Sequence, residues 1–178
     1  MNRLEHLQLM AAYNQWMNDK LLIAAASLPT EEVSADRKAF FGSILGTLNH
    51  LIVADIIWLK RFARHPSGFP ALDAVRRLDD PQALSQQMFA DVAQLAEQRR
   101  MLDQAIVEWV GQLHDADLDV TLRYANTAGI AAARNFYGLL IHLFNHQTHH
   151  RGQATTLLTQ AGADVGSTDL LALVPNLD

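Results

Sequence analysis

The sequence contains no cysteine among its 178 residues. This absence excludes a disulfide scaffold, a protein thiolate nucleophile, a cysteine-type zinc finger and an iron–sulfur site. Any bound metal must therefore be held by histidine, aspartate, glutamate or backbone oxygen. Eight histidines are present that could supply such ligands.

An excess of positive charge is also missing, because 14 lysines and arginines stand against 19 aspartates and glutamates, which gives a net charge of −5. Such a chain has no general attraction for phosphate backbones, so we expect no nucleic-acid partner. The longest apolar run near the N-terminus covers only residues 21–26, whereas a bilayer span needs about 20 residues. No signal peptide is recognisable there. We expect a cytoplasmic protein without a membrane partner, forming one domain over residues 1–178.

Four segments carry apolar residues at three- and four-residue spacings, which is the pattern of amphipathic helices. The spacings predict helices over residues 4–28, 43–63, 80–111 and 134–160. The third of these is predicted to begin with Asp80 as the N-cap and Pro81 at the first helical position. Four long helices around a common apolar seam predict an all-α four-helix bundle.

The helical spacing fails in the long connection between the third and fourth predicted helices, residues 115–133. There Leu118, Val120 and Leu122 alternate with polar residues, which predicts a short extended pair, a possible β-hairpin, or an irregular connection. The tail over residues 164–178 is partly apolar, so we expect it to pack on the body of the protein.

Histidines recur every four residues in the last predicted helix, at His142, His146 and His150. A four-residue step turns a helix by about 40° and rises about 6 Å, so neighbouring members share a face and can converge on one metal ion. His142 and His150 lie about 12 Å apart along the axis, too far to join one ion easily. The spacing therefore allows a metal at the 142/146 pair or the 146/150 pair, and it equally allows structural or exposed histidines without a metal.

A pair of imidazoles needs at least one further ligand, and His50 is the other histidine that lies in a predicted long helix away from its ends. Three neutral histidines that leave a coordination position open are typical of catalytic metal sites. Gln147 stands beside His146 where a zinc peptidase has its glutamate base, so that mechanism is excluded. His149 turns away from the pair and is expected near the site or on the surface. No role is predicted for the histidines near segment ends or in loops, which are His6, His65 and His114.

Two histidine-bearing segments, residues 41–51 with Trp58 and residues 142–153, resemble the signatures of the DinB-like family, which is named for DNA-damage-inducible proteins. Residues 13–18 are similar to the Tyr-x-x-Trp motif in the family's first helix, and residues 168–171 are similar to its tail. The resemblance covers nearly the whole chain, and the two histidine motifs together are specific.

The resemblance implies a four-helix bundle with up-down-down-up connectivity that forms a homodimer. It also implies a divalent metal held by His50, His146 and His150, with Zn²⁺ or Ni²⁺ as the first choices and Fe or Mn as alternatives. Relatives in the wider superfamily are metal-dependent thiol transferases and isomerases that use mycothiol, bacillithiol or glutathione.

The leading hypothesis is a metal-dependent enzyme acting on a small-molecule substrate, such as an S-transferase for a low-molecular-weight cellular thiol. A metal-dependent hydrolase is chemically equally allowed, because a bound metal activates water as well as thiols. A non-enzymatic stress-responsive or metal-responsive protein is the rival class. A closed shell of four ligands without a cavity would favour this rival, and an open ligand position beside a cleft would favour the enzyme. A third hypothesis is an interaction module with Phe40, Phe41 or residues 170–174 as a dimer face.

Five further residues are candidates for supporting roles. Asp55 lies five residues after His50, about 140° around the helix, so it does not point in the direction of that histidine. It either accepts a hydrogen bond from a metal-binding histidine or pairs two helices in the core, and the second role is favoured. Asn49 and Asn145 either orient ligands or substrate or lie on a helix surface. Helical spacing places Tyr13 in the core, and only the motif resemblance makes it a candidate for the site. Arg151 could meet an anionic substrate or lie on the surface.

Overall fold

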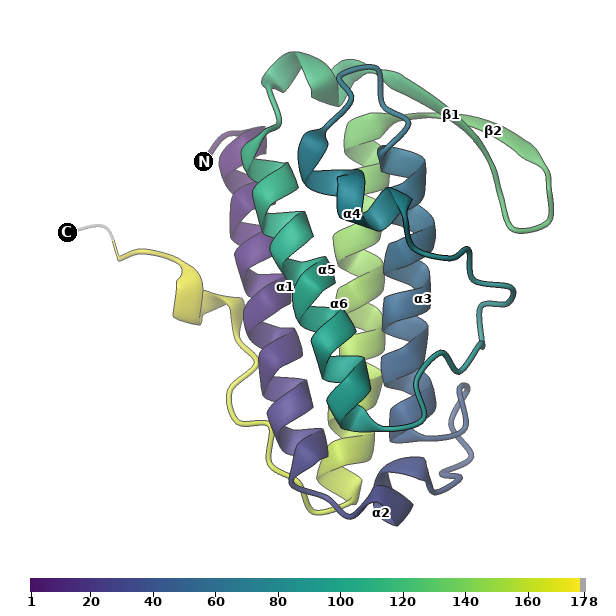
Figure 1. The fold of residues 1–178 in the computed structure, drawn as a ribbon. Coiled ribbons are helices and arrows are strands. Elements are labelled where there is room, and N and C mark those ends of the chain that lie inside the picture. Colours follow the sequence, from purple (N-terminus) through teal and green to yellow (C-terminus); the bar gives the residue numbers. More distant parts are fainter. Residues whose placement is uncertain (177–178) are drawn as a thin grey trace.

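The computed structural model describes residues 1–176, most of which are helical, together with one small antiparallel sheet (Figure 1). Four helices are much longer than the others and lie side by side. These are α1 (Arg3–Ala26), α3 (Ile44–Phe62), α5 (Val92–Gly111) and α6 (Phe136–Gln160). The short elements are α2 (Thr30–Ser34), α4 (Asp73–Arg76), the strands β1 (Thr121–Ala125) and β2 (Ala131–Asn135), and the 3₁₀ turns Pro70–Leu72, Asp115–Asp119 and Leu170–Leu173.

Each long helix begins at a polar residue that caps its first turn. The Asn2 side chain accepts a hydrogen bond from the Glu5 backbone N–H at 2.9 Å, and the Glu5 carboxylate accepts one from the Asn2 N–H at 2.8 Å. Ser43, Asp91 and Asn135 likewise accept from the N–H three residues further on, at 2.9–3.0 Å. These caps satisfy N–H groups that have no partner inside the helix, so they fix where the helices start.

The long helices bury one shared core. Helix α1 packs against α5 and α6, and α3 packs against the same two helices. Aromatic rings join three of the helices near one end: Phe62 stacks on Trp109 with the centroids 5.3 Å apart, and Phe136 meets Phe62 edge-on at 5.4 Å. All three rings are fully buried, so this end of the core resists movement of α3 relative to α6.

The predicted start of the third long helix is wrong. Asp80 and Pro81 do not begin it; α5 begins at Val92, and residues 80–91 form an irregular segment. The physical reason is that α3 binds the backbone of this segment. The Asn49 amide accepts from the Phe89 N–H at 2.9 Å and donates to the Phe89 carbonyl at 3.0 Å. Backbone groups held by another helix are not free to form their own helical ladder.

The extended pair predicted in the long connection is confirmed. Strands β1 and β2 pair antiparallel, with Thr121 opposite Asn135 and Ala125 opposite Ala131. The turn between them contains Gly129, whose φ of +78° lies in the region that favours glycine. Since residues 134 and 135 belong to β2, the last helix begins at Phe136 rather than at the predicted residue 134.

The C-terminal tail packs on the body, as predicted, although its last two residues, 177–178, lie outside the described part. It runs along α1 in Figure 1. The Tyr13 hydroxyl donates a 2.7 Å hydrogen bond to the Thr168 carbonyl, and Leu170 and Leu173 pack against the core. Within residues 1–176, no helix is both long enough and apolar enough to cross a membrane.

Candidate metal centre

Three imidazoles from two helices converge on one point. His50 comes from α3, and His146 and His150 come from adjacent turns of α6. The Nε2 atom of His50 lies 3.4 Å from that of His146 and 3.2 Å from that of His150. One ligand atom from each ring lies within 4.8 Å of the others. Of the two pairs that the spacing allows, the structure therefore brings 146/150 to His50.

The outer nitrogens of two of these rings face hydrogen-bond acceptors. His50 Nδ1 lies 2.8 Å from the Leu84 carbonyl oxygen, which can only accept, so this nitrogen carries the ring proton. His150 Nδ1 lies 2.8 Å from Gln153 Oε1 in the same way. A neutral imidazole protonated at Nδ1 has a lone pair at Nε2. The lone pairs of His50 and His150 therefore point at the centre of the cluster.

This donor set fits a divalent cation. The Nε2 lone pairs of His50 and His150, with the nitrogens 3.2 Å apart, repel one another unless a positive ion or a shared proton lies between them. With Zn–N bonds of about 2.0–2.1 Å, tetrahedral geometry separates two ligand nitrogens by about 3.3 Å. His146 Nδ1 is buried and has no hydrogen-bond partner within residues 1–176, so its ring is held by packing alone. The three residues can hold an ion and would leave further coordination positions open.

The surroundings keep these imidazoles neutral. Burial lowers the pKa of His50 and of His150 below the ordinary histidine value. Burial, followed by the charge of the neighbouring imidazoles, lowers the pKa of His146 to about 3. Neutral imidazole is the form that binds metal, so protons compete weakly at pH 7.

One side of the cluster is covered and another opens into a cavity. The Phe41 ring stacks on His50 with the centroids 3.8 Å apart, and it meets His150 edge-on at 5.5 Å. A cavity of 250 Å³ is lined by His50 and His146, together with Trp58 and other residues. A small molecule in this cavity would touch two of the three imidazoles.

Of the candidate supporting residues, Asn49 reaches the cluster indirectly. It holds the segment whose Leu84 carbonyl orients His50. Asp55 is fully buried, forms a 2.6 Å ion pair with Arg99 and accepts a hydrogen bond from Gln147, so it pairs α3 with α5 and α6. Asn145 is exposed on α6.

Tyr13 and Arg151 contribute to packing between helices and tail. The Tyr13 ring lies under the Arg151 guanidinium, with 5.3 Å from Arg151 Cζ to the ring centroid. Arg151 is buried and donates hydrogen bonds to Asn14 and Thr148. Its guanidinium is therefore committed inside the protein rather than presented to a substrate.

The remaining histidines divide between the cavity, the surface and the core. His142 lies outside the three-imidazole cluster, lines the 250 Å³ cavity and meets Trp58 edge-on at 5.0 Å. His149 is exposed beside His150. His65, for which no role was predicted, is buried between Phe69 and Phe136 and is part of the core. His6 and His114 take no part in the cluster.

Sequence reasoning missed three parts of the site: the Leu84 carbonyl, the Gln153 side chain and the stacking of Phe41 on His50. The contact of Gln153 with His150 could have been predicted, because side chains three residues apart on one helix are neighbours. The other two depend on loops that fold back onto α3, which helical spacing does not reveal.

The fold and the cluster define a class: a mostly helical protein whose paired helices present three imidazoles able to hold a divalent metal. The chain belongs to the DinB family, whose sequence profile matches residues 1–175. It is similar to Protein DinB of Bacillus subtilis (strain 168), with 27% identity over 157 residues, which covers 88% of this chain and 87% of that protein. No solved structure matches the chain. The family resemblance seen in the motifs is thereby confirmed.

Proposed function

We propose that this protein is a metal-dependent enzyme in which His50, His146 and His150 hold a divalent ion, Zn²⁺ or Ni²⁺ before Fe²⁺ or Mn²⁺. The convergence of three Nε2 atoms, with two of the rings oriented by acceptors at Nδ1, carries this proposal. Imidazole suits zinc, nickel and iron, and the absence of carboxylate from the cluster places Mn²⁺ last and disfavours harder ions such as Mg²⁺.

The cavity beside the cluster favours an enzyme over a purely structural site. Structural metal sites are closed by four protein ligands, whereas catalytic sites keep a position open. Within residues 1–176 the cluster offers three ligands and borders a 250 Å³ cavity. This arrangement supports a small-molecule substrate that approaches His50 and His146.

S-transfer from a low-molecular-weight thiol is the reaction that we propose first. A divalent metal at this position lowers the pKa of a thiol or water bound to it. In the transfer, the thiol sulfur forms a bond to an electrophilic carbon, the leaving group departs with its bonding electrons, and the thiol proton passes to solvent. The chain has no cysteine, so the thiol must arrive as a substrate. The residues of the chain hold the ligand rings in place and exclude water from the face that Phe41 covers.

We also propose the finer architecture that the resemblance implies, an up-down-down-up four-helix bundle that forms a homodimer. The contacts of α1 and α3 with both α5 and α6 support the bundle.

Metal analysis of the purified protein tests the site. We expect about one divalent ion per chain in the wild type and strong loss of metal in His50→Ala and His146→Ala. His142→Ala is the matched control, since it removes an imidazole from the same helix that lies outside the cluster. Unchanged metal content in both ligand variants would overturn the proposed centre.

The reaction is tested separately with metal-loaded protein. Glutathione, bacillithiol and mycothiol are each offered with an electrophile such as monochlorobimane, and an activated ester is offered without thiol. We expect thiol conjugation that disappears in His146→Ala. Ester hydrolysis without any thiol conjugation would replace the transferase by a hydrolase.

A further inference from the structure

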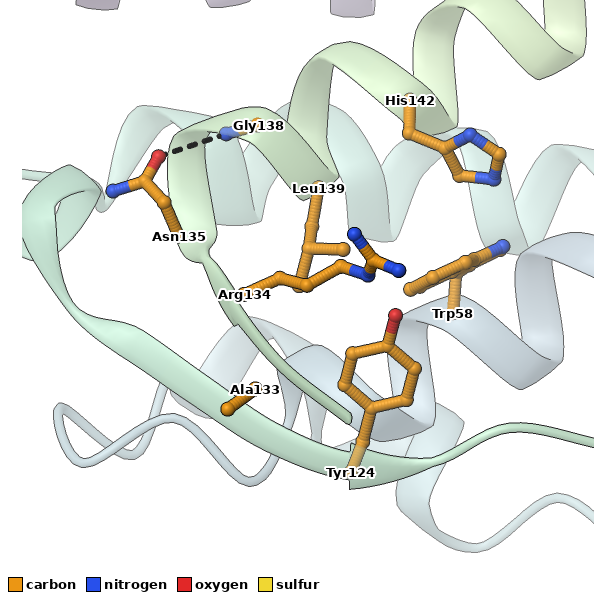
Figure 2. A pocket seen from close by; sticks show the side chains of 8 residues that line it. All are labelled: Trp58, Tyr124, Ala133, Arg134, Asn135, Gly138, Leu139 and His142. Atoms are coloured by element: carbon orange, nitrogen blue, oxygen red, sulfur yellow. Dashed lines mark hydrogen bonds between the residues drawn. The ribbon is translucent and has the colours of Figure 1, made fainter. Parts of the chain in front are cut away.

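A larger cleft lies next to the imidazole cluster, between α3, α6 and the β1–β2 hairpin. Its volume is 680 Å³, and Figure 2 shows Trp58, Tyr124, Arg134 and His142 among the side chains that line it. Trp58 and His142 also line the 250 Å³ cavity at the cluster, so the two spaces meet at these side chains. The combined space is of the size that small-molecule ligands occupy.

Two arginines line this space without a carboxylate partner. Arg134, on β2, lines the cleft, and Arg61, at the end of α3, lines the cavity at the cluster. Within residues 1–176, neither side chain forms an ion pair or a hydrogen bond. The chain has a net charge of −5, so two unpaired cations in adjoining spaces make the local charge here positive.

Stacking holds Arg61 in a position to bind an anion. Its Cζ atom lies 4.6 Å from the Trp58 ring centroid and 4.9 Å from the Tyr124 ring centroid. A guanidinium held by aromatic rings keeps the N–H groups at its edge available, and these match a carboxylate with two parallel hydrogen bonds. In Figure 2 the Arg134 guanidinium points toward Trp58 and the Tyr124 hydroxyl, which belong to the two rings that Arg61 contacts.

The lining contains little negative charge that would repel an anion. A third cavity of 380 Å³ adjoins the first two at Arg61 and Tyr124. Asp80, which lines this third cavity, is the one carboxylate among the residues that line the three spaces, and it is paired with Lys60 at 2.7 Å. The aromatic rings of Trp58 and Tyr124 supply apolar surface next to the cations.

We propose that this cleft is the binding site for a carboxylate-bearing small molecule, with its carboxylate on Arg61 and Arg134 and its apolar part against Trp58. The reactive end of the ligand then extends past His142 toward the His50 and His146 rings. This site would define the substrate class of the proposed enzyme. Only the placement of the reactive end rests on the proposed function, because it assumes that the chemistry occurs at the imidazole cluster.

The test is calorimetric titration with two matched probes, 2-naphthoate and its neutral analogue 2-naphthamide, on metal-free protein. We expect naphthoate to bind more tightly than naphthamide by about tenfold or more, because charge-assisted hydrogen bonds distinguish the two. Arg134→Met and Arg61→Met should each weaken naphthoate binding by about tenfold and leave naphthamide nearly unchanged. Arg61→Lys, which keeps the charge but loses the planar fork, should retain part of the affinity.

Arg123→Met is the control, because Arg123 is an exposed arginine of the same hairpin that does not line the cleft. It should bind naphthoate like the wild type. Equal binding of the two probes, or wild-type affinity in both arginine variants, would overturn the proposal.

Repeating the titration with Zn²⁺-loaded protein separates the two proposals. Naphthoate binding that requires Zn²⁺, is lost in His146→Ala and survives in the arginine variants would place the anion on the metal and reject the cleft. Arginine-dependent binding in a protein that retains no metal would support the cleft while the proposed metal centre fails.

Discussion

The packing around the imidazole cluster is so close that it depends on the size of single residues. Gly46 lies in the first turn of α3, and a Cβ atom added there would come 2.0 Å from the Phe41 backbone oxygen. The chain before α3 can therefore fold back over the helix only because residue 46 has no side chain. That fold-back brings the Phe41 ring onto His50.

We expect Gly46→Ala to displace the Phe41 backbone. The cost of such overpacking is about 1–3 kcal/mol of unfolding free energy, and metal affinity should fall because Phe41 no longer supports His50. Urea denaturation and Zn²⁺ titration measure the two effects. Gly152→Ala is the control: its Cβ would meet nothing within 4 Å, so it should stabilise α6 by about 1 kcal/mol. Equal stability of the two variants would refute this account.

At the scale of the helices, a buried polar network joins all four long elements. Arg99 of α5 pairs with Asp55 of α3 at 2.6 Å and with Asp103 of α5 at 2.9 Å. Asp103 accepts hydrogen bonds from Asn14 and Asn18 of α1 at 3.0 and 2.9 Å. On α6, Gln147 bonds to Asp55 and Arg151 bonds to Asn14. Gln147 and Arg151 each follow a cluster histidine directly, so the network fixes the rotation of α6 that aims His146 and His150.

Removing the central cation of this network should be costly. Arg99→Met leaves the Asp55 and Asp103 carboxylates buried without the cation that pairs with both, and breaking a buried pair costs about 3–5 kcal/mol. We expect a loss of that order in urea denaturation. Arg100→Met changes an exposed arginine one residue away and should shift stability by less than about 0.5 kcal/mol. A small effect of Arg99→Met would show that the network contributes little to stability.

The same network predicts a pH dependence. Burial and the charge of Asp55 raise the pKa of Asp103 to about 6, although Arg99 opposes the shift. A carboxyl whose pKa is higher in the folded than in the unfolded state holds its proton more tightly when folded. Its stabilising contribution is therefore complete below the unfolded pKa and is lost as pH rises through about 6.

We expect this group to contribute a loss of about 1 kcal/mol between pH 5 and pH 7.5. Because histidines also titrate in this range, the measurement is the difference between the wild type and Asp103→Asn in urea denaturation at both pH values. Asp79→Asn, at an exposed carboxylate, should keep the wild-type profile. An identical pH profile for Asp103→Asn and the wild type would refute the assignment.

At the scale of the whole molecule, the proposed metal would connect helices that are distant in sequence. His50 and His150 lie on α3 and α6, and the Leu84 carbonyl of the segment before α5 contacts His50. A ligand that binds the folded chain alone stabilises it by mass action. Metal binding should therefore stabilise the entire fold rather than one loop.

With free Zn²⁺ at about 100 times its Kd, unfolding free energy should rise by about 2.7 kcal/mol. Thermal denaturation should show a higher Tm with Zn²⁺, reversed by a chelator, in the wild type and in His142→Ala. In His150→Ala the increase should largely disappear. The same Tm increase in His150→Ala and the wild type would contradict a centre shared between α3 and α6.

The sequence predicted elements more reliably than their ends. Apolar spacing located four long helices and the lost spacing located the hairpin, because both patterns are local. The start of α5 was misplaced because Asn49 and His50 bind the backbone of residues 80–91, and that contact spans about forty residues. Propensity near Pro81 is weaker than such tertiary hydrogen bonds.

The sequence by itself determined that any metal would need histidine ligands and that two turns of one helix could present them, since both follow from residue types and helix geometry. The tertiary structure decided which imidazoles meet, because only packing of α3 on α6 brings His50 within 3.4 Å of its partners. It also decided what lies beside them. Arg61 and Arg134 are 73 residues apart in the chain, and only the fold of the hairpin over α3 places them in two adjoining spaces.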